Sequence, residues 1–186
     1  MAAGIVTSDI FEPYAKALMS LARENDLSDR IGEDAATVIE AIENAQELDQ
    51  LLDSPLVEDD KKKAVLRSIF SEALHPYSLN FLLLLVDRGR AVFAKGIFEQ
   101  YQALLREIKG IVLAEVVSAV ALSDEQANEV RQRVLAMTGA NDAELKTSVD
   151  GDLLGGVIIK VGSQVIDASL RSQIRRLSLQ LTSAAG

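Results

Sequence analysis

The side chains that most often carry out chemistry are few in this sequence, and they do not converge on one site. His75 is the single histidine, and it stands beside a proline with no serine or cysteine arranged around it. A general acid or base needs a partner within hydrogen-bond reach, so we expect an ordinary loop residue here. The acidic pairs Asp59-Asp60 and Asp150/Asp152 have the ligand type of a metal site, but a helix start and a turn explain them more simply. The sequence therefore predicts no catalytic residue and no metal site.

A glycine-rich segment at residues 155–163 is the one stretch that could cradle a phosphate group. A nucleotide phosphate loop has the pattern G-x-x-x-x-G-K-[ST], in which backbone N–H groups and the lysine surround the phosphates. Here Lys160 stands in the wrong position, and no lysine precedes Ser163. The G-x-G-x-x-G pattern of dinucleotide-binding folds is also missing from the sequence. We expect no bound nucleotide and no other cofactor.

Composition excludes further classes of site. The chain has 186 residues and no cysteine, which excludes disulfides, thiolate nucleophiles and thiolate metal ligands. Residues 1–60 carry 15 acidic against three basic side chains, a net charge of −12, whereas residues 61–186 carry 13 acidic against 16 basic. An acidic region repels phosphate backbones, so we expect no nucleic-acid binding through the first part of the chain. It suits a partner segment that carries positive charge.

No stretch of the sequence is suited to cross a membrane or to direct secretion. Residues 1–10 lack the basic start and the apolar run of a secretory signal. The longest uninterrupted apolar run is Phe81–Val86, six residues long, whereas a spanning helix needs about 20. We expect contact with a membrane only through other proteins.

Hydrophobic periodicity predicts six helices between residues 8 and 109. Apolar residues recur there at spacings of three and four. The first helix is expected to begin at Ser8 or Asp9, with Pro13 in its first turn, where no internal N–H bond is lost. The fifth helix has almost no polar face, so it must be surrounded by protein or have one side waiting for a partner. The expected ranges are 8–24, 29–44, 45–52, from 58 onward, 78–87 and 91–109.

The remaining residues predict a small α/β domain after Gly110. A run rich in β-branched residues at 111–122 indicates a strand. Ser123 and Gln126 form a capping-box pattern for a helix that ends at Gly139. Strands are then expected at 143–149, 153–161 and 164–167. The fold class is therefore α+β, with an N-terminal six-helix bundle at residues 1–109 and a C-terminal α/β domain at residues 110–186.

The end of the chain combines two turns with a terminal helix. Asp150-Gly151 suits a tight hairpin turn between the strands on either side, and Gly162-Ser163 makes a second turn. Gly155-Gly156 interrupts a strand, which indicates a bulge or a close backbone approach. Asp167 or Ser169 can cap the helix that follows. Its apolar stripe consists of Leu170, Ile174, Leu177 and Leu181.

These motifs occur in an order that resembles a known family. Leu153–Gly162 reads L-L-G-G-V-I-I-K-V-G, and Asp167–Leu177 reads D-A-S-L-R-S-Q-I-R-R-L. The order resembles the C-terminal signature of the delta subunit of F-type ATP synthases, whose mitochondrial relative is the oligomycin-sensitivity-conferring protein. The resemblance covers essentially the whole chain. It implies a non-catalytic stator subunit that joins the catalytic head to the peripheral stalk, so that rotor torque drives ATP synthesis instead of turning the head.

The resemblance also implies partners and contact residues. The bundle would receive the N-terminal helix of an alpha subunit in a groove between its first and fifth helices, which match the family at Pro13–Ala17 and Asn80–Arg90. The expected contacts there are Tyr14, Ala17, Leu18, Leu21, Phe81, Leu84 and Leu85. The C-terminal domain would hold the b-type stalk subunits, with expected contacts at Gly155, Gly156, Leu170, Ile174 and Leu177. One copy per complex is implied, peripheral to the plasma or thylakoid membrane on its cytoplasmic or stromal face.

Four alternatives stay open at this level. The groove residues, Leu18 and Phe81 above all, could form ordinary bundle core. A helical RNA-binding adaptor of the antitermination type would use a similar bundle, although the net charge of −12 over residues 1–60 argues against it. A small metal-dependent hydrolase would use the acidic pairs, although no histidine or third carboxylate converges on them. Finally, Arg171, Arg175 and Arg176 form either a solvated face or a contact for an acidic partner helix.

Overall fold

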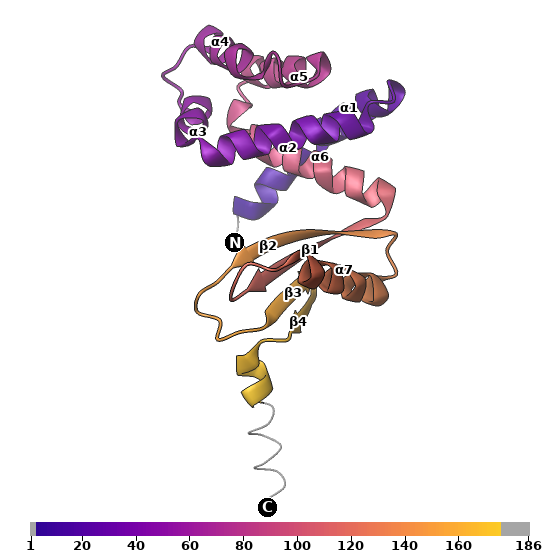
Figure 1. Ribbon diagram of the computed structural model, residues 1–186. Helices are drawn as coiled ribbons and strands as arrows, with labels where there is room; N and C mark the ends of the chain where they lie inside the picture. Colours follow the sequence, from indigo (N-terminus) through magenta and orange to yellow (C-terminus); the bar gives the residue numbers. More distant parts are fainter. Residues whose placement is uncertain (1–2, 176–186) are drawn as a thin grey trace, which may run out of the picture. The chain divides into compact units, whose positions relative to one another are not determined.

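The chain folds into two compact units, a helical one and one built on a β-sheet (Figure 1). The computed structural model describes residues 3–175, with side chains from residue 10 onward. The first unit covers Met1–Leu105 and the second Arg106–Gly186. The sequence placed this boundary at Gly110. The α+β class follows directly from the helices and the four-stranded sheet.

Helices make up the first unit. They follow one another through short connections, as the hydrophobic periodicity predicts. The helix α6 runs past the last residue of the unit. The elements are α1 (Ala3–Glu24), α2 (Ser28–Asn44), α3 (Gln46–Asp53), α4 (Asp59–Phe70), α5 (Pro76–Asp87), the 3₁₀ turn η1 (Ala91–Phe93) and α6 (Ala94–Lys109).

The start of α1 differs from the prediction. The helix begins at Ala3, so Ser8 and Asp9 lie inside it and Pro13 lies in its interior rather than in its first turn. Proline removes one backbone donor from a helix, a cost of about 3 kcal/mol. The helix continues through it because the following turns bury Ala15, Leu18, Met19 and Ala22 in the core.

One face of each helix forms the core of the first unit. On α2 the buried positions Ile31, Ala35, Val38 and Ile42 recur every three or four residues, as predicted. The largest fully buried side chain is Tyr101, whose hydroxyl donates to the carbonyl of Ser28 at 3.0 Å. Burial, together with the nearby negative charges of Asp29 and Asp34, raises the pKa of Tyr101 to about 12.

The second unit is a mixed four-stranded sheet with one helix on it. The strand order is β2-β1-β3-β4, with β1 parallel to β2 and antiparallel to β3. Alternate residues of β1 (Ala114 and Val116) face Val130 and Val134 of α7 in the core. The elements are β1 (Ile111–Ser118), α7 (Asp124–Thr138), β2 (Asp142–Val149), β3 (Val157–Val161) and β4 (Gln164–Asp167), followed by helical residues 170–175.

The predicted hairpin at Asp150-Gly151 is wrong. The strands on either side of it, β2 and β3, both pair with β1, which lies between them. Strand β1 can take this central place because it is rich in β-branched residues and packs apolar side chains on the helix-covered face. Asp150 instead accepts the N–H of Asp152 at 2.9 Å and starts a longer connection. The second predicted turn is confirmed: Gly162, at φ +56°, joins β3 to β4 as an antiparallel hairpin.

The predicted ends of α7 are confirmed. The Ser123 hydroxyl accepts the N–H of Gln126 at 3.3 Å, and the Gln126 side chain accepts the N–H of Ser123 at 3.0 Å. Gly139 closes the helix in the left-handed conformation. The strand before α7 is shorter than predicted, because Ser118 ends it by donating its hydroxyl to the carbonyl of Val120 at 2.7 Å.

Candidate protein-binding surfaces

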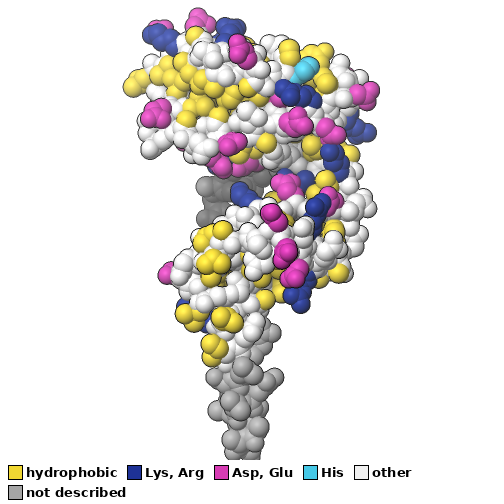
Figure 2. All heavy atoms as spheres, viewed as in Figure 1, with side chains coloured by type: hydrophobic (Ala, Val, Ile, Leu, Met, Phe, Trp, Pro, Cys, Tyr) yellow, Lys and Arg dark blue, Asp and Glu magenta, His cyan; other side chains and the backbone are white. Residues whose placement is uncertain are grey.

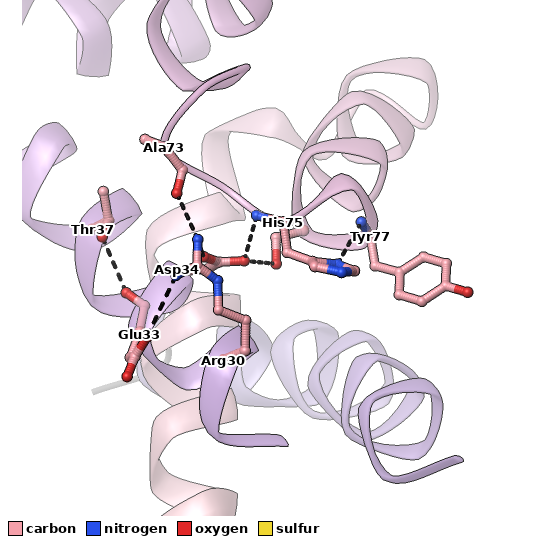
Figure 3. A network of polar contacts seen from close by, with 8 residues as sticks. Arg30, Glu33, Asp34, Thr37, Ala73, His75 and Tyr77 are labelled. Atoms are coloured by element: carbon pink, nitrogen blue, oxygen red, sulfur yellow. Dashed lines mark hydrogen bonds and ion pairs between the residues drawn. The ribbon is translucent and has the colours of Figure 1, made fainter. Parts of the chain in front are cut away.

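A buried carboxylate ties the start of α5 to α2 (Figure 3). Asp34 accepts the hydroxyl of Ser78 at 2.5 Å and the backbone N–H of His75 at 2.9 Å, and its other oxygen lies 3.3 Å from Arg30. Arg30 also donates to the carbonyl of Ala73 at 2.9 Å. A buried charge is tolerated only when it is paired and hydrogen-bonded, and Asp34 meets both conditions. The network therefore fixes where α5 begins.

Helix α5 starts two residues earlier than predicted because its first turn is capped. Pro76 occupies the first helical position, where its missing N–H costs nothing. His75 is the N-cap, and its Nδ1 accepts the N–H of Tyr77 at 3.3 Å. The rings of His75 and Tyr77 also pack together, with centroids 5.3 Å apart. The break predicted at this dipeptide is therefore the helix start itself.

Two contacts between residues in or next to α1 and α5 indicate that these helices run in opposite directions. Near the start of α1, the ring of Phe11 packs on Phe93, just beyond the end of α5, with centroids 5.9 Å apart. Gly96 makes room for this ring, because a Cβ there would lie 2.4 Å from it. Just after the end of α1, the amide oxygen of Asn25 accepts the hydroxyl of Tyr77 at 3.5 Å. The first half of α1 is thus near the end of α5, and its end is near the start of α5.

Each of these helices presents an apolar stripe along this pairing. On α1 the stripe is Tyr14, Ala17 and Leu21, and on α5 it is Tyr77, Phe81 and Leu84; spacings of three and four place each set on one helix face. Leu21, Tyr77 and Leu84 are 37%, 39% and 43% exposed. Ala17 is exposed, and Tyr14 and Phe81 are half-buried. We call these six residues the α1/α5 face.

Two of the predicted groove residues do not belong to this surface. Leu18 is 2% exposed and Leu85 is fully buried, and both lie in the core of the first unit. They are out of reach of a partner because they lie on the inner faces of their helices and pack in the core. Conversely, the sequence missed Tyr77, which precedes the predicted helix start. Proline at the first helical position was the signal that could have found it.

The two glycines predicted as stalk contacts allow other parts of the chain to approach their backbone closely. A Cβ on Gly156 would lie 2.4 Å from the carbonyl oxygen of Ala168, and one on Gly155 would lie 2.7 Å from the Leu170 side chain. The Leu170 N–H donates to the carbonyl of Gly155 at 2.9 Å. The predicted close backbone approach is therefore confirmed, and it seats the start of the last helix. Both predicted caps take part there, as Asp167 accepts the Ser169 N–H and Ser169 accepts the Ser172 N–H.

Large apolar side chains gather at one end of the sheet. The last residues of β1 and β2 pair with each other, β3 begins opposite the last residue of β1, and β4 ends opposite the start of β3. Figure 2 shows hydrophobic side chains along the side of the second unit from which helical residues 170–175 extend. We call this the sheet-end surface. Its members, between 45% and 69% exposed, are Val120, Val149, Leu154, Leu170 and Ile174. Leu177 and Arg176 lie outside the described residues.

The described residues include two surface hollows, one in each unit. They contain no group of three or more His, Cys, Asp or Glu side chains that could hold a metal ion. A crevice of about 230 Å³ opens between α3, α4 and η1, below the range of about 300–1,000 Å³ typical of ligand sites. A larger hollow of about 650 Å³ is wide open to solvent and is lined by polar side chains of one helix, α7: Glu125, Asn128, Glu129, Gln132 and Arg133. No helix in the described part of the chain is long and apolar enough to cross a membrane.

Charged pairs mark the outer surface of both units. Arg131 donates to the carboxylate of Asp142, which also accepts the N–H of Ala143, and these bonds lower the pKa of Asp142. In the first unit, the carboxylate of Asp87 holds the ammonium of Lys63 and raises its pKa. Each pair has at least one side chain more than 40% exposed to water, so each contributes little to stability.

Comparison with known proteins identifies the family. A model of the "ATP synthase delta (OSCP) subunit" family matches residues 10–181. The "ATP synthase subunit delta" of Crocosphaera subtropica is 48% identical over 185 residues, covering 100% of both chains. The protein of the same name from Synechococcus elongatus is 51% identical over 175 residues, covering 94% of this chain and 97% of its own.

The fold agrees with a solved structure. A chain in the cryo-EM structure of the Toxoplasma gondii mitochondrial ATP synthase hexamer matches with a TM-score of 0.71 at 24% identity, covering 92% of this chain and 96% of that one. The sequence matches, which run nearly from end to end, carry the assignment, and they give no support to the RNA-binding alternative. This chain belongs to the ATP synthase delta (OSCP) subunit family.

Proposed function

We propose that this chain is the stator subunit that joins the catalytic head of the ATP synthase to its peripheral stalk, with one partner docked on each unit. Its contribution is binding free energy and stiffness, with no bond chemistry of its own. The observation that carries the proposal is the α1/α5 face: four of its six residues, Ala17, Leu21, Tyr77 and Leu84, are exposed on the two helices.

The partner of the α1/α5 face is the N-terminal helix of an alpha subunit. An amphipathic helix docks by laying its apolar side chains between two other helices, which the paired stripes favour. In this arrangement the first six helices act as one bundle that presents the face. The net charge of −12 over residues 1–60 favours a docking helix with positive charge on its outer side. A nanomolar contact of this kind is worth about 12 kcal/mol.

The partner of the second unit is the b-type stalk, which contacts the sheet-end surface. Exposed apolar patches on a soluble unit mark interaction sites more often than chance. Exposed Arg171 and Arg175 stand beside the apolar positions Leu170 and Ile174 on the last helix, so an acidic amphipathic helix suits this surface. One copy would then bridge head and stalk on the cytoplasmic or stromal face of the plasma or thylakoid membrane, reaching the membrane only through the complex.

Ala17→Asp tests the alpha-subunit contact. Ala17 is exposed at the middle of the α1 stripe, so the new carboxylate would stay in water in the free chain and lose that water when a helix docks. Affinity for a peptide of the alpha-subunit N-terminus should fall by well over tenfold, about 1.4 kcal/mol or more. Isothermal titration calorimetry measures the affinity, and circular dichroism checks that the helices remain.

Ala36→Asp is the matched control, because Ala36 is an exposed alanine on α2 outside the face. It adds the same charge and should leave the affinity within twofold of the parent chain. Equal losses in both variants would point to net charge, and an unchanged affinity in Ala17→Asp would remove α1 from the site.

For the stalk, Leu154→Asp should weaken co-purification with the b-type subunits. Met137→Asp should not, since Met137 lies near the start of β2, at the opposite end of the sheet.

A further inference from the structure

Among the described residues, His75 is the one side chain that caps the first turn of α5. Pro76 has no N–H, so Tyr77 carries the first free donor of the helix, and it donates to Nδ1 of His75 at 3.3 Å. An imidazole nitrogen accepts a hydrogen bond only when it carries no proton. The cap therefore requires a neutral His75 whose proton is on Nε2.

The capped residue belongs to the α1/α5 face. Tyr77 begins the α5 stripe, and its hydroxyl makes the contact with Asn25 that closes one end of the α1–α5 pair. Its ring also packs on the His75 ring. Figure 3 shows the His75 ring between the Asp34 network on one side and Tyr77 on the other. The imidazole therefore lies between the hydrogen-bonded Asp34 network and Tyr77, an exposed residue of the α1/α5 face.

We propose that His75 is a positioning residue for the α1/α5 face, and that its protonation weakens the docking of an amphipathic helix there. The imidazolium ion has no acceptor, so the Tyr77 N–H loses its partner. Its positive charge also lies at the positive end of the α5 dipole, which is unfavourable.

Charged groups of α2 and of the turn before α5 lie beside His75 in the structure or in the sequence. Asp34 accepts the backbone N–H of His75, but its charge is balanced by Arg30 at 3.3 Å. Glu33 also pairs with Arg30, at 3.5 Å, and is exposed. Glu72, in the preceding turn, is exposed as well. Two of the three carboxylates thus share one guanidinium, and no carboxylate is hydrogen-bonded to the imidazole itself in the described structure.

The first test uses the chain alone. Because His75 is the only histidine, its ring signals in an NMR titration are unambiguous. The Tyr77 amide signal should move with the same midpoint as the His75 ring, and amide exchange at Tyr77 should accelerate about fivefold in the protonated form, the factor that corresponds to a typical N-cap. In His75→Asn, whose side-chain oxygen accepts but does not titrate, both changes should vanish. A Tyr77 amide that ignores the His75 titration would overturn the proposal.

The second test measures docking and rests on the proposed function. Binding of the chain to synthase depleted of its delta subunit is compared at about pH 7.5 and about pH 5.5. The parent chain should lose about fivefold more affinity on acidification than His75→Asn, and His75→Ala should bind weakly at both values. Equal pH dependence in the parent and His75→Asn would overturn the docking role. If Ala17→Asp left binding unchanged, α1 would not be part of the docking site and the docking role of His75 would fail with it, whereas the NMR result would still decide whether His75 positions Tyr77.

Discussion

Gly156→Ala is expected to damage the second unit more than any other glycine substitution there. The added Cβ would lie 2.4 Å from the carbonyl oxygen of Ala168 and 2.9 Å from the Cα of Ser169. Both are backbone atoms, so no side-chain rotation can relieve the contact. The residue also has φ +81°, which L side chains rarely adopt. The start of the last helix must therefore move away from the β2–β3 connection.

The cost can be worked from the bonds that this movement breaks. A displacement on the order of 1 Å is needed to restore ordinary van der Waals separation. It would break the Ala168 N–H bond to the Val157 carbonyl (3.0 Å) and the Leu170 N–H bond to the Gly155 carbonyl (2.9 Å). Each is worth about 1 kcal/mol net, and the positive φ adds about 1–2 kcal/mol. The sum is about 3–4 kcal/mol, lost locally.

Gly162→Ala is the matched control. Gly162 also has a positive φ, +56°, but a Cβ there would meet nothing within 4 Å. Only the backbone strain of about 1–2 kcal/mol should remain. The difference between the two variants, about 2 kcal/mol, therefore isolates the steric contact.

Hydrogen exchange measures this difference directly. The Ala168 and Leu170 amides should exchange at least tenfold faster in Gly156→Ala than in Gly162→Ala, since about 1.4 kcal/mol is a factor of ten. All five Phe and three Tyr residues lie in the first unit, so the near-UV circular dichroism, which they dominate, should not change. Equal exchange rates in the two variants would refute the assignment of Gly156 as a backbone contact.

Three further substitutions test the packing and the electrostatics. Tyr101→Phe should lower the free energy of unfolding by about 1 kcal/mol at neutral pH, because the bond to Ser28 is lost. The folded state raises the Tyr101 pKa from 10.0 to about 12, so the free energy of unfolding of the parent chain should fall as pH rises above 10. Urea titrations should find a smaller fall in the variant. Arg131 lowers the pKa of Asp142, so Asp142 contributes stability above its ordinary pKa of 3.8, and this stability is lost as pH falls below that value. In Asp142→Asn, the melting temperature should therefore fall less on acidification than in the parent chain. An equal fall in both chains would contradict the pairing. Asp34→Ala leaves a buried cluster without its acceptor and should cost about 3 kcal/mol in urea unfolding, whereas a cost below 1 kcal/mol would mean that water replaces the carboxylate.

Local patterns in the sequence predicted where helices and strands lie better than which strands pair with each other. The capping box at Ser123 and the helix end at Gly139 are local chemistry, and both were found where expected. Strand pairing is not local. Asp150-Gly151 has the composition of a hairpin turn, but β1, which comes before α7 in the sequence, pairs with both neighbouring strands. Nothing within a few residues of the turn encodes that insertion.

The candidate site shows the same division. On α1, the family resemblance grouped Tyr14, Ala17 and Leu21 with Leu18, which the structure buries. In α5, four consecutive leucines carry no period, so the sequence could not separate exposed Leu84 from buried Leu85. Only the packing of the other helices decides which leucine faces outward.

Different contacts lie at the two ends of the α1/α5 face, and one of them depends on the protonation of a side chain. At one end, Phe11 packs on Phe93, and no group that titrates near neutral pH takes part in this contact. At the other end, the Asn25–Tyr77 contact depends on a cap that His75 supplies only when it is neutral. Protonation would therefore loosen the face from one end while the other stays closed. A docked helix would keep its contacts around Tyr14, near the Phe11 end, so the response should be a graded loss of affinity rather than release.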